Sequence, residues 1–112
     1  MQAAVWGPVG WSFLHSVAHG YPDAPSAFDR ENGLPDGTTA DRYKIFFTVV
    51  GWVLPCKYCR ESYLSYISES PPRMRSRSTL TKWLWEIHNK VNDKLGAEYS
   101  GADFNTTCAK YE

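Results

Sequence analysis

The sequence predicts an all-α protein, a four-helix bundle with a short fifth C-terminal helix, formed by a single domain over residues 1–112. Apolar residues recur at steps of three and four in four separate segments, which is the spacing of one face of a helix. No segment alternates apolar and polar residues as a half-buried strand does. Segments containing Gly and Pro separate the helical ones, so the expected bundle has clear loops.

Composition excludes several classes of function. The 12 basic and 12 acidic residues balance, so no net charge attracts nucleic acid or an anionic membrane. No apolar run approaches membrane-spanning length, and the N-terminus lacks the pattern of a secretory signal. Localisation therefore stays open. Five Trp and seven Tyr in so small a chain indicate an aromatic core or aromatic walls for a flat ligand.

The first helix is expected to begin at Pro8, after a lead-in over residues 1–7, because the fixed φ of proline suits a first turn. Gly20-Tyr21-Pro22 ends this helix. Residues 23–37 contain further Pro and Gly and show no period, so we predict a loop there. The residues at helical spacing before the loop are Trp11, Leu14, His15 and Ala18.

The second helix is expected to start at Thr38-Thr39-Ala40-Asp41, which has the spacing of a capping box, and to run into Pro55. A third helix is predicted over residues 57–68, ended by Pro71-Pro72. The inward-facing residues are Tyr43, Phe46, Phe47, Val50 and Leu54 in the second helix and Tyr63, Tyr66 and Ile67 in the third.

The fourth helix is predicted over residues 78–95, ended by Gly96, and a short fifth near residues 104–111. Arg73, Arg75 and Arg77 precede it and are interpreted as a solvated loop. The apolar stripe of the fourth helix consists of Leu80, Leu84, Ile87, Val91 and Leu95. Along one flank of that stripe stand Thr81, Trp85, His88, Asn89 and Asn92, which a purely structural helix would not require.

Pro55-Cys56-Lys57-Tyr58-Cys59 is the segment on which the function depends. Two cysteines at this spacing can close a small disulfide or supply two metal ligands. Proline before Cys56 allows a helix to begin there, so both sulfurs are expected near a helix N-terminus, which favours a thiolate. Lys57 and Arg60 add positive charge. The pattern indicates a reactive pair.

Three interpretations of the pair follow. A structural zinc site needs two further ligands, with Cys108, His88, His15 and His19 as candidates, and none of these forms a second closely spaced ligand pair. A thioredoxin-like motif requires a βαβ context that the sequence lacks. A redox disulfide in a helical protein exchanges with thiols unaided, but passing electrons onward requires a cofactor.

A flat redox cofactor such as a flavin needs aromatic walls, hydrogen-bond partners and cations for phosphates. The sequence contains no G-x-G-x-x-G loop, so a dinucleotide would lie among the helices. The side chains that could serve are Trp11 with His15, Trp85 with His88, Asn89 and Asn92, and the cations Lys94 and Lys110.

Three separated blocks resemble the Erv/ALR sulfhydryl oxidases. They are Trp6-Gly7-Pro8 with Trp11 and Leu14-His15, then Pro55-Cys56-Lys57-Tyr58-Cys59, and then residues 83–96, whose His-Asn-x-Val-Asn-x-Lys-Leu core is the most specific block. The order of the blocks is that of the family. The resemblance covers roughly residues 6 to 96 and matches the tail only loosely.

The resemblance implies a helical bundle that holds FAD, with a disulfide between Cys56 and Cys59 beside the flavin ring. Cys59 would be the sulfur next to the flavin, and Cys56 the sulfur that a substrate thiolate attacks. No metal is implied. The cofactor-binding positions implied are Gly7, Trp11, His15, Trp85, His88, Asn89, Val91, Asn92, Lys94, Lys110 and Tyr111.

The reaction so implied oxidises a thiol-containing protein or a thioredoxin-like carrier and reduces dioxygen to hydrogen peroxide. The family also implies a homodimer through the first two helices, where Tyr43, Phe46 and Phe47 would form the interface if they are not core residues. The compartment would be a host cytoplasm or virion if the protein is viral, and otherwise an oxidising organelle.

The chain departs from the family at two positions. Trp85 stands where many cellular members carry a cysteine of a second structural disulfide, and Cys108 alone cannot form a shuttle pair. Such a minimal form resembles those of large DNA viruses. The alternative function is a non-enzymatic helical module in which Cys56 and Cys59 hold zinc and residues 73–77 contact a partner.

Overall fold

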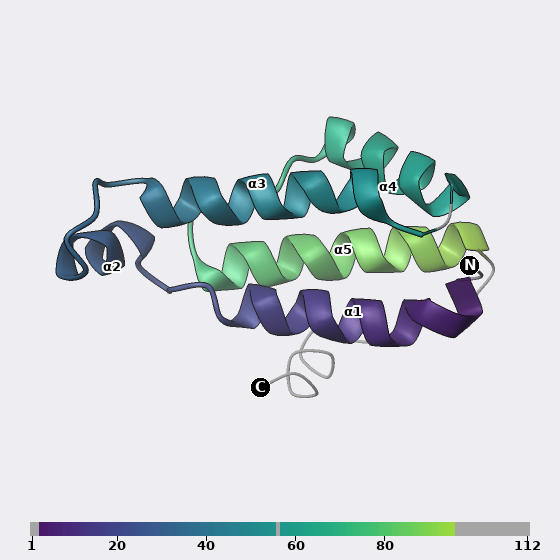
Figure 1. Cartoon of the computed structure of the whole chain (residues 1–112), viewed down its shortest axis with the longest axis horizontal. Coiled ribbons are helices and arrows are strands. Elements are labelled where there is room, and N and C mark those ends of the chain that lie inside the picture. The colour runs from purple at the N-terminus through teal and green to yellow at the C-terminus, as the bar shows by residue number, and fades with distance from the viewer. Residues whose placement is uncertain (1–2, 56, 96–112) are drawn as a thin grey trace.

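The computed structural model describes residues 3–55 and 57–95, and the side chains of residues 8–55, 57 and 59–91. Within these ranges the protein forms helices and no strand, which confirms the all-α prediction (Figure 1). The predicted short helix near residues 104–111 lies outside them, as does Cys108. The helices are α1 (Ala3–His19), α2 (Pro25–Glu31), α3 (Thr38–Val53), α4 (Lys57–Glu69) and α5 (Arg77–Leu95).

Helix α5 is the centre of the bundle, lying between α1 and α3 with α4 alongside (Figure 1). It presents the predicted apolar stripe to the core as far as Val91, and the side chain of Leu95 is outside the described part. The ring of Trp83 is fully buried and meets Phe47 edge-on at 5.7 Å between ring centroids. The core consists of Leu14, Ala18, Tyr21, Phe47, Val50, Tyr63, Leu80, Trp83, Leu84, Ile87 and Val91.

No described helix combines the length and the apolarity that crossing a lipid bilayer would require.

Helix α1 begins earlier than the sequence predicts. It starts at Ala3, so Pro8 lies inside the helix and not in its first turn. Proline has no N–H, so the helix forgoes one hydrogen bond to the carbonyl of Ala4. The two alanines at its start are strong helix formers and extend it through the expected lead-in.

The predicted loop over residues 23–37 contains α2, which corrects that prediction. Pro25 occupies the first turn, and Asn32 ends the helix by donating its side-chain amide to the carbonyl of Phe28 at 2.8 Å. Gly33 then reverses the chain at φ +71°, a conformation that glycine adopts at little cost. A helix of seven residues is too short to show a period in the sequence.

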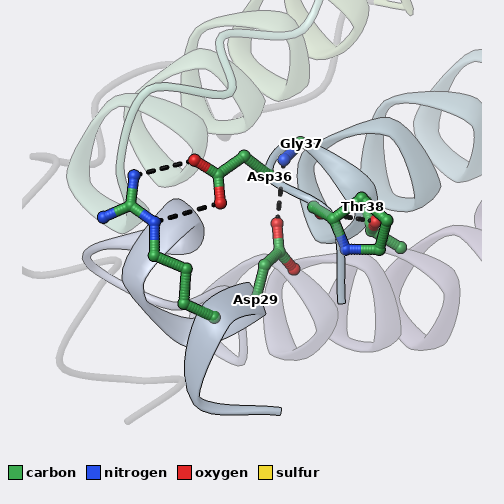
Figure 2. A network of polar contacts seen from close by, with 6 residues as sticks. Asp29, Asp36, Gly37 and Thr38 are labelled. Atoms are coloured by element: carbon green, nitrogen blue, oxygen red, sulfur yellow. Dashed lines mark hydrogen bonds and ion pairs between the residues drawn. The ribbon is translucent and has the colours of Figure 1, made fainter. Parts of the chain in front are cut away.

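Helix α2 caps the start of α3 through the carboxylate of Asp29, which is 0% exposed (Figure 2). The carboxylate accepts hydrogen bonds from the N–H groups of Gly37 and Thr39, at 3.0 and 3.1 Å, and from the hydroxyl of Thr39 at 2.5 Å. The predicted capping box is therefore wrong. Thr38 donates its hydroxyl to the carbonyl of Pro35, and the cap comes from another helix.

The Thr39 hydroxyl, followed by the backbone N–H groups of Thr39 and Gly37, holds the pKa of Asp29 below its usual value, although burial opposes the shift. A lowered folded-state pKa means that the stabilisation is present above the unfolded pKa and is lost as the pH falls through the folded one. We expect Asp29→Asn to lower Tm by about 4–8 °C at neutral pH. The difference from wild type should shrink below about pH 4.

Thermal unfolding of both proteins between acid and neutral pH checks this. Asp36→Asn is the control, because it removes only the exposed ion pair with Arg30 and should change Tm little. A Tm difference that is the same at both ends of the pH range would contradict the assignment.

Candidate active site

Cys59 lies in the first turn of α4 and is 3% exposed. Cys56 falls outside the described residues, directly before the helix begins at Lys57. The helix therefore starts where the sequence predicts, with Pro55 before it. The N–H groups of a first turn are not used within the helix, and together with the helix dipole they favour a thiolate over a thiol.

Helix α4 is held tightly against α3 beside this turn. A Cβ on Gly51 would lie 2.7 Å from side-chain atoms of both Tyr63 and Leu64, so only glycine permits this approach. The hydroxyl of Tyr63 donates to the carbonyl of Phe47 at 2.7 Å, and burial raises the pKa of Tyr63 well above its usual value. The phenol thus remains a neutral donor. The contact between α3 and α4 fixes the position of Cys59.

Two histidines from different helices meet in the interior. Nε2 of His15 in α1 lies 2.9 Å from Nδ1 of His88 in α5, and their exposed fractions are 1% and 2%. One nitrogen donates and the other accepts, so this contact holds one proton. The ring of Trp11 stacks on that of His88, with centroids 4.0 Å apart and planes 11° from parallel. These three side chains form the aromatic–imidazole cluster.

The structure brings some predicted site residues together and leaves others unplaced. Trp11, His15 and His88 form the aromatic–imidazole cluster, while Trp85 and Asn89 are half-buried on α5 and Val91 is buried in the core. Gly7 lies in α1. Asn92 and Lys94 lie in α5, but their side chains are not described; Lys110 and Tyr111 are outside the described residues.

The cluster and Cys59 lie at different heights along the bundle. Figure 1 shows that α4 begins at the same end of the bundle as α1, where α5 ends. The hydroxyl of Tyr66 donates to the carbonyl of Lys90 at 3.2 Å, which sets the level of α4 against α5. Cys59 is seven residues before Tyr66, about 10 Å along a helix axis.

The described residues contain no further set of ligands for the zinc interpretation. Among residues whose placement is described, no three His, Cys, Asp or Glu side chains lie close enough to hold a metal ion. The facing nitrogens of His15 and His88 are occupied by their mutual hydrogen bond.

The roles of two residues that shape this site are not evident from the sequence. The role of Gly51 could have been suspected, because glycine inside a helical period often marks a close approach of another helix. Arg60 contributes more than its charge, because its Nη1 donates to the carbonyl of Leu54 at the end of α3, at 2.6 Å. No sequence pattern predicts a hydrogen bond from a side chain to a distant main-chain carbonyl.

The fold and site together define a class, a helical bundle with a cysteine pair at the start of one helix and an aromatic–imidazole cluster between two others. The sequence matches the Erv1 / Alr family over residues 8–111. The chain belongs to that family.

Two relatives illustrate the similarity. The chain is 37% identical over 89 residues to the "Mitochondrial FAD-linked sulfhydryl oxidase ERV1" of Saccharomyces cerevisiae, covering 80% of this chain and 42% of the relative. It is 38% identical over 99 residues to a "Probable FAD-linked sulfhydryl oxidase" of Acanthamoeba polyphaga mimivirus, covering 86% and 62%. The chain thus spans less than two thirds of either relative.

Solved structures agree with the fold. The crystal structure of the yeast Erv1 core superposes with a TM-score of 0.82 at 29% identity, covering 100% of this chain and 85% of that one. The crystal structure of the FAD binding domain of Erv1 from Saccharomyces cerevisiae gives 0.82 at 31% identity, covering 99% and 94%.

Proposed function

We propose that the protein is an FAD-dependent thiol oxidase that forms disulfide bonds in substrate proteins through Cys56 and Cys59 and reduces dioxygen to hydrogen peroxide. The observation that carries this proposal is the buried position of Cys59 in the first turn of α4, within a fold that matches an FAD binding domain with a TM-score of 0.82. The names of the two relatives support it.

The residues present fit a dinucleotide. An adenine or isoalloxazine ring needs a planar partner, and the indole of Trp11, which stacks on His88, is the candidate for it. Asn89, half-buried one residue after His88 on α5, is the candidate polar group at the edge of such a ring. By family resemblance the remaining positions would be Gly7, Trp85, Val91, Asn92, Lys94, Lys110 and Tyr111.

The cysteine pair would perform the exchange chemistry. A substrate thiolate attacks Cys56, the bond to Cys59 breaks, and Cys59 leaves as a thiolate that the helix N-terminus favours. Burial keeps protein substrates away from Cys59, so attack falls on Cys56. A second substrate thiol then resolves the mixed disulfide, so that two thiols lose two electrons and two protons. FAD, when bound, supplies the acceptor for these electrons and the route to dioxygen.

A visible absorption spectrum of the purified protein, combined with oxygen uptake in dithiothreitol, tests the proposal. Flavin bands and hydrogen peroxide formation would support it. A colourless protein that also fails to bind added FAD would overturn it. In that case a zinc analysis decides the alternative, because only a zinc module predicts stoichiometric metal with both cysteines open to alkylation after chelation.

We further propose that a second copy of the chain covers an exposed apolar face. Of the aromatic residues expected at this interface, Phe47 is fully buried, whereas Tyr43 and Phe46 are half-buried against the core. Phe13 of α1 meets Phe46 of α3 edge-on at 6.4 Å, so the two helices share this face. Its exposed apolar residues are Val9 and Phe13 in α1 and Ile45, Val49, Trp52 and Val53 in α3.

Replacing Trp52, which is 69% exposed, with Asp should convert a dimer to a monomer, because a charge buried in an apolar interface is desolvated without a partner. Size-exclusion chromatography with light scattering measures the mass. Phe28→Asp, at an exposed residue of α2, is the control and should leave the mass unchanged. A wild-type protein that is already monomeric at micromolar concentration would contradict the proposed interface.

A further inference from the structure

Arg60 in α4 makes a hydrogen bond back to Leu54, the residue that ends α3. Its Nη1 donates to the carbonyl oxygen of Leu54 at 2.6 Å. Leu54 is the C-cap of α3 and has extended backbone angles, φ −61° and ψ 141°, so its carbonyl points away from the helical ladder. Pro55 follows and has no N–H to offer. The guanidinium thus gives the end of α3 a hydrogen-bond donor from α4.

The bond fixes a short segment at both ends. Leu54 packs against the hydrophobic core, and Arg60 belongs to a helix that Gly51 holds close to α3. Between these points the chain contains Cys56, and Cys59 directly precedes Arg60. The contact is partly buried, where a hydrogen bond from a charged donor is stronger than at the surface.

We propose that Arg60 is a positioning residue of the cysteine pair. It keeps the segment between Leu54 and α4 in one conformation when the two cysteines are reduced, and thereby favours their return to the disulfide. The inference rests on the proposed function, in which the pair cycles between these two states. A segment already restrained has less conformational freedom to lose when the sulfur–sulfur bond forms.

The relevant equilibrium is exchange with glutathione. The bond between Cys56 and Cys59 breaks, the protein gains two electrons and two protons, and two glutathione thiols lose them to form glutathione disulfide. The charge of Arg60 acts in the opposite direction, because a cation favours thiolates and hence the reduced state. Restraint and charge therefore predict shifts of opposite sign when the side chain is removed.

The test uses the full chain with FAD bound, equilibrated without oxygen in glutathione buffers, quenched with acid and alkylated with a mass-tagged reagent. We expect Arg60→Gln to lower the equilibrium constant for disulfide formation about tenfold. Lys57→Gln is the matched control, since its exposed side chain next to Cys56 makes only a 4.0 Å ion pair with Glu61. It should leave the constant unchanged or raise it. Arg60→Lys should also lower the constant, but by less than Arg60→Gln. If Arg60→Gln does not fold, Arg60→Lys provides the test.

An unchanged constant in both Arg60 variants would overturn the inference, as would a rise that matches Lys57→Gln. If the role of Arg60 were purely structural, replacing it would lower Tm even in a protein without Cys56 and Cys59. The glutathione equilibrium of the cysteine pair would then be unchanged. Failure of the proposed function looks different, because the wild-type protein would then bind no FAD and take up no oxygen with dithiothreitol, whatever its glutathione equilibrium. That result overturns both proposals, whereas a normal wild-type constant with unshifted variants overturns only the role of Arg60.

Discussion

Replacing Cys59 with Ser should reduce dithiothreitol-dependent oxygen uptake by about a thousandfold or more while the bound FAD stays. A serine hydroxyl in the same first turn of α4 neither forms a disulfide with Cys56 nor leaves as a stable anion at neutral pH. The substituted atom is small and the site is buried, so the helix and its contacts with α3 should persist. Oxygen uptake measures the loss, and the visible spectrum measures the FAD that remains.

Ser62→Ala is the matched control for this experiment. Ser62 is also small, buried and in α4, three residues further along the helix, and no step of the proposed reaction uses it. This variant should retain its oxygen uptake. Near-normal oxygen uptake by Cys59→Ser would show that electrons reach dioxygen by a route other than the cysteine pair.

The long helices could be predicted because each buries one face over several turns. In α5 the residues Leu80, Leu84 and Ile87 recur at helical spacing, and all three are buried in the core. Periodicity is a local signal that survives in any tertiary context. It therefore located α3, α4 and α5 near their observed ends.

Helix α2 could not be predicted, because tertiary contacts stabilise it. Seven residues cannot sustain a helix alone in water. Asp29, which reads as a polar loop residue, is the group that α3 requires at its N-terminus, and a bond between residues ten apart leaves no pattern in the sequence. The same reason explains the failed capping box at Thr38, since local spacing predicts a local cap while a distant carboxylate supplies it.

The three side chains of the aromatic–imidazole cluster stand out in the sequence, but their mutual geometry does not. Sequence placed His15 and His88 on the inner edges of two helices and identified Trp11 as an aromatic wall. Their hydrogen bond and stacking depend on how α1 and α5 pack, which no single-helix pattern specifies. Arg60 illustrates the same limit, because its charge is visible in the sequence but its bond to Leu54 exists only once α3 and α4 have docked.

Trp83→Ala should lower the free energy of unfolding by about 3–5 kcal/mol, the usual cost of deleting a fully buried indole. The ring is 0% exposed and contacts Phe47, and its Nε1 donates to the carbonyl of Ser70 at 2.7 Å. Trp83→Phe keeps the ring contact and loses the hydrogen bond, so its cost should be smaller, about 1–2 kcal/mol. Urea unfolding of the three proteins gives the values.

The destabilisation caused by Trp83→Ala should also affect the candidate active site. Trp83 links α5 to α3 through Phe47 and to the end of α4 through Ser70, and α4 carries Cys59 at its other end. A ligand that binds only the folded state stabilises it by mass action, so FAD at a hundred times its dissociation constant adds about 2.7 kcal/mol. FAD should therefore raise the stability of Trp83→Ala without restoring it to that of wild type. If FAD left Tm unchanged in both proteins, the bundle would not be a FAD-binding fold, whatever the loss caused by the substitution.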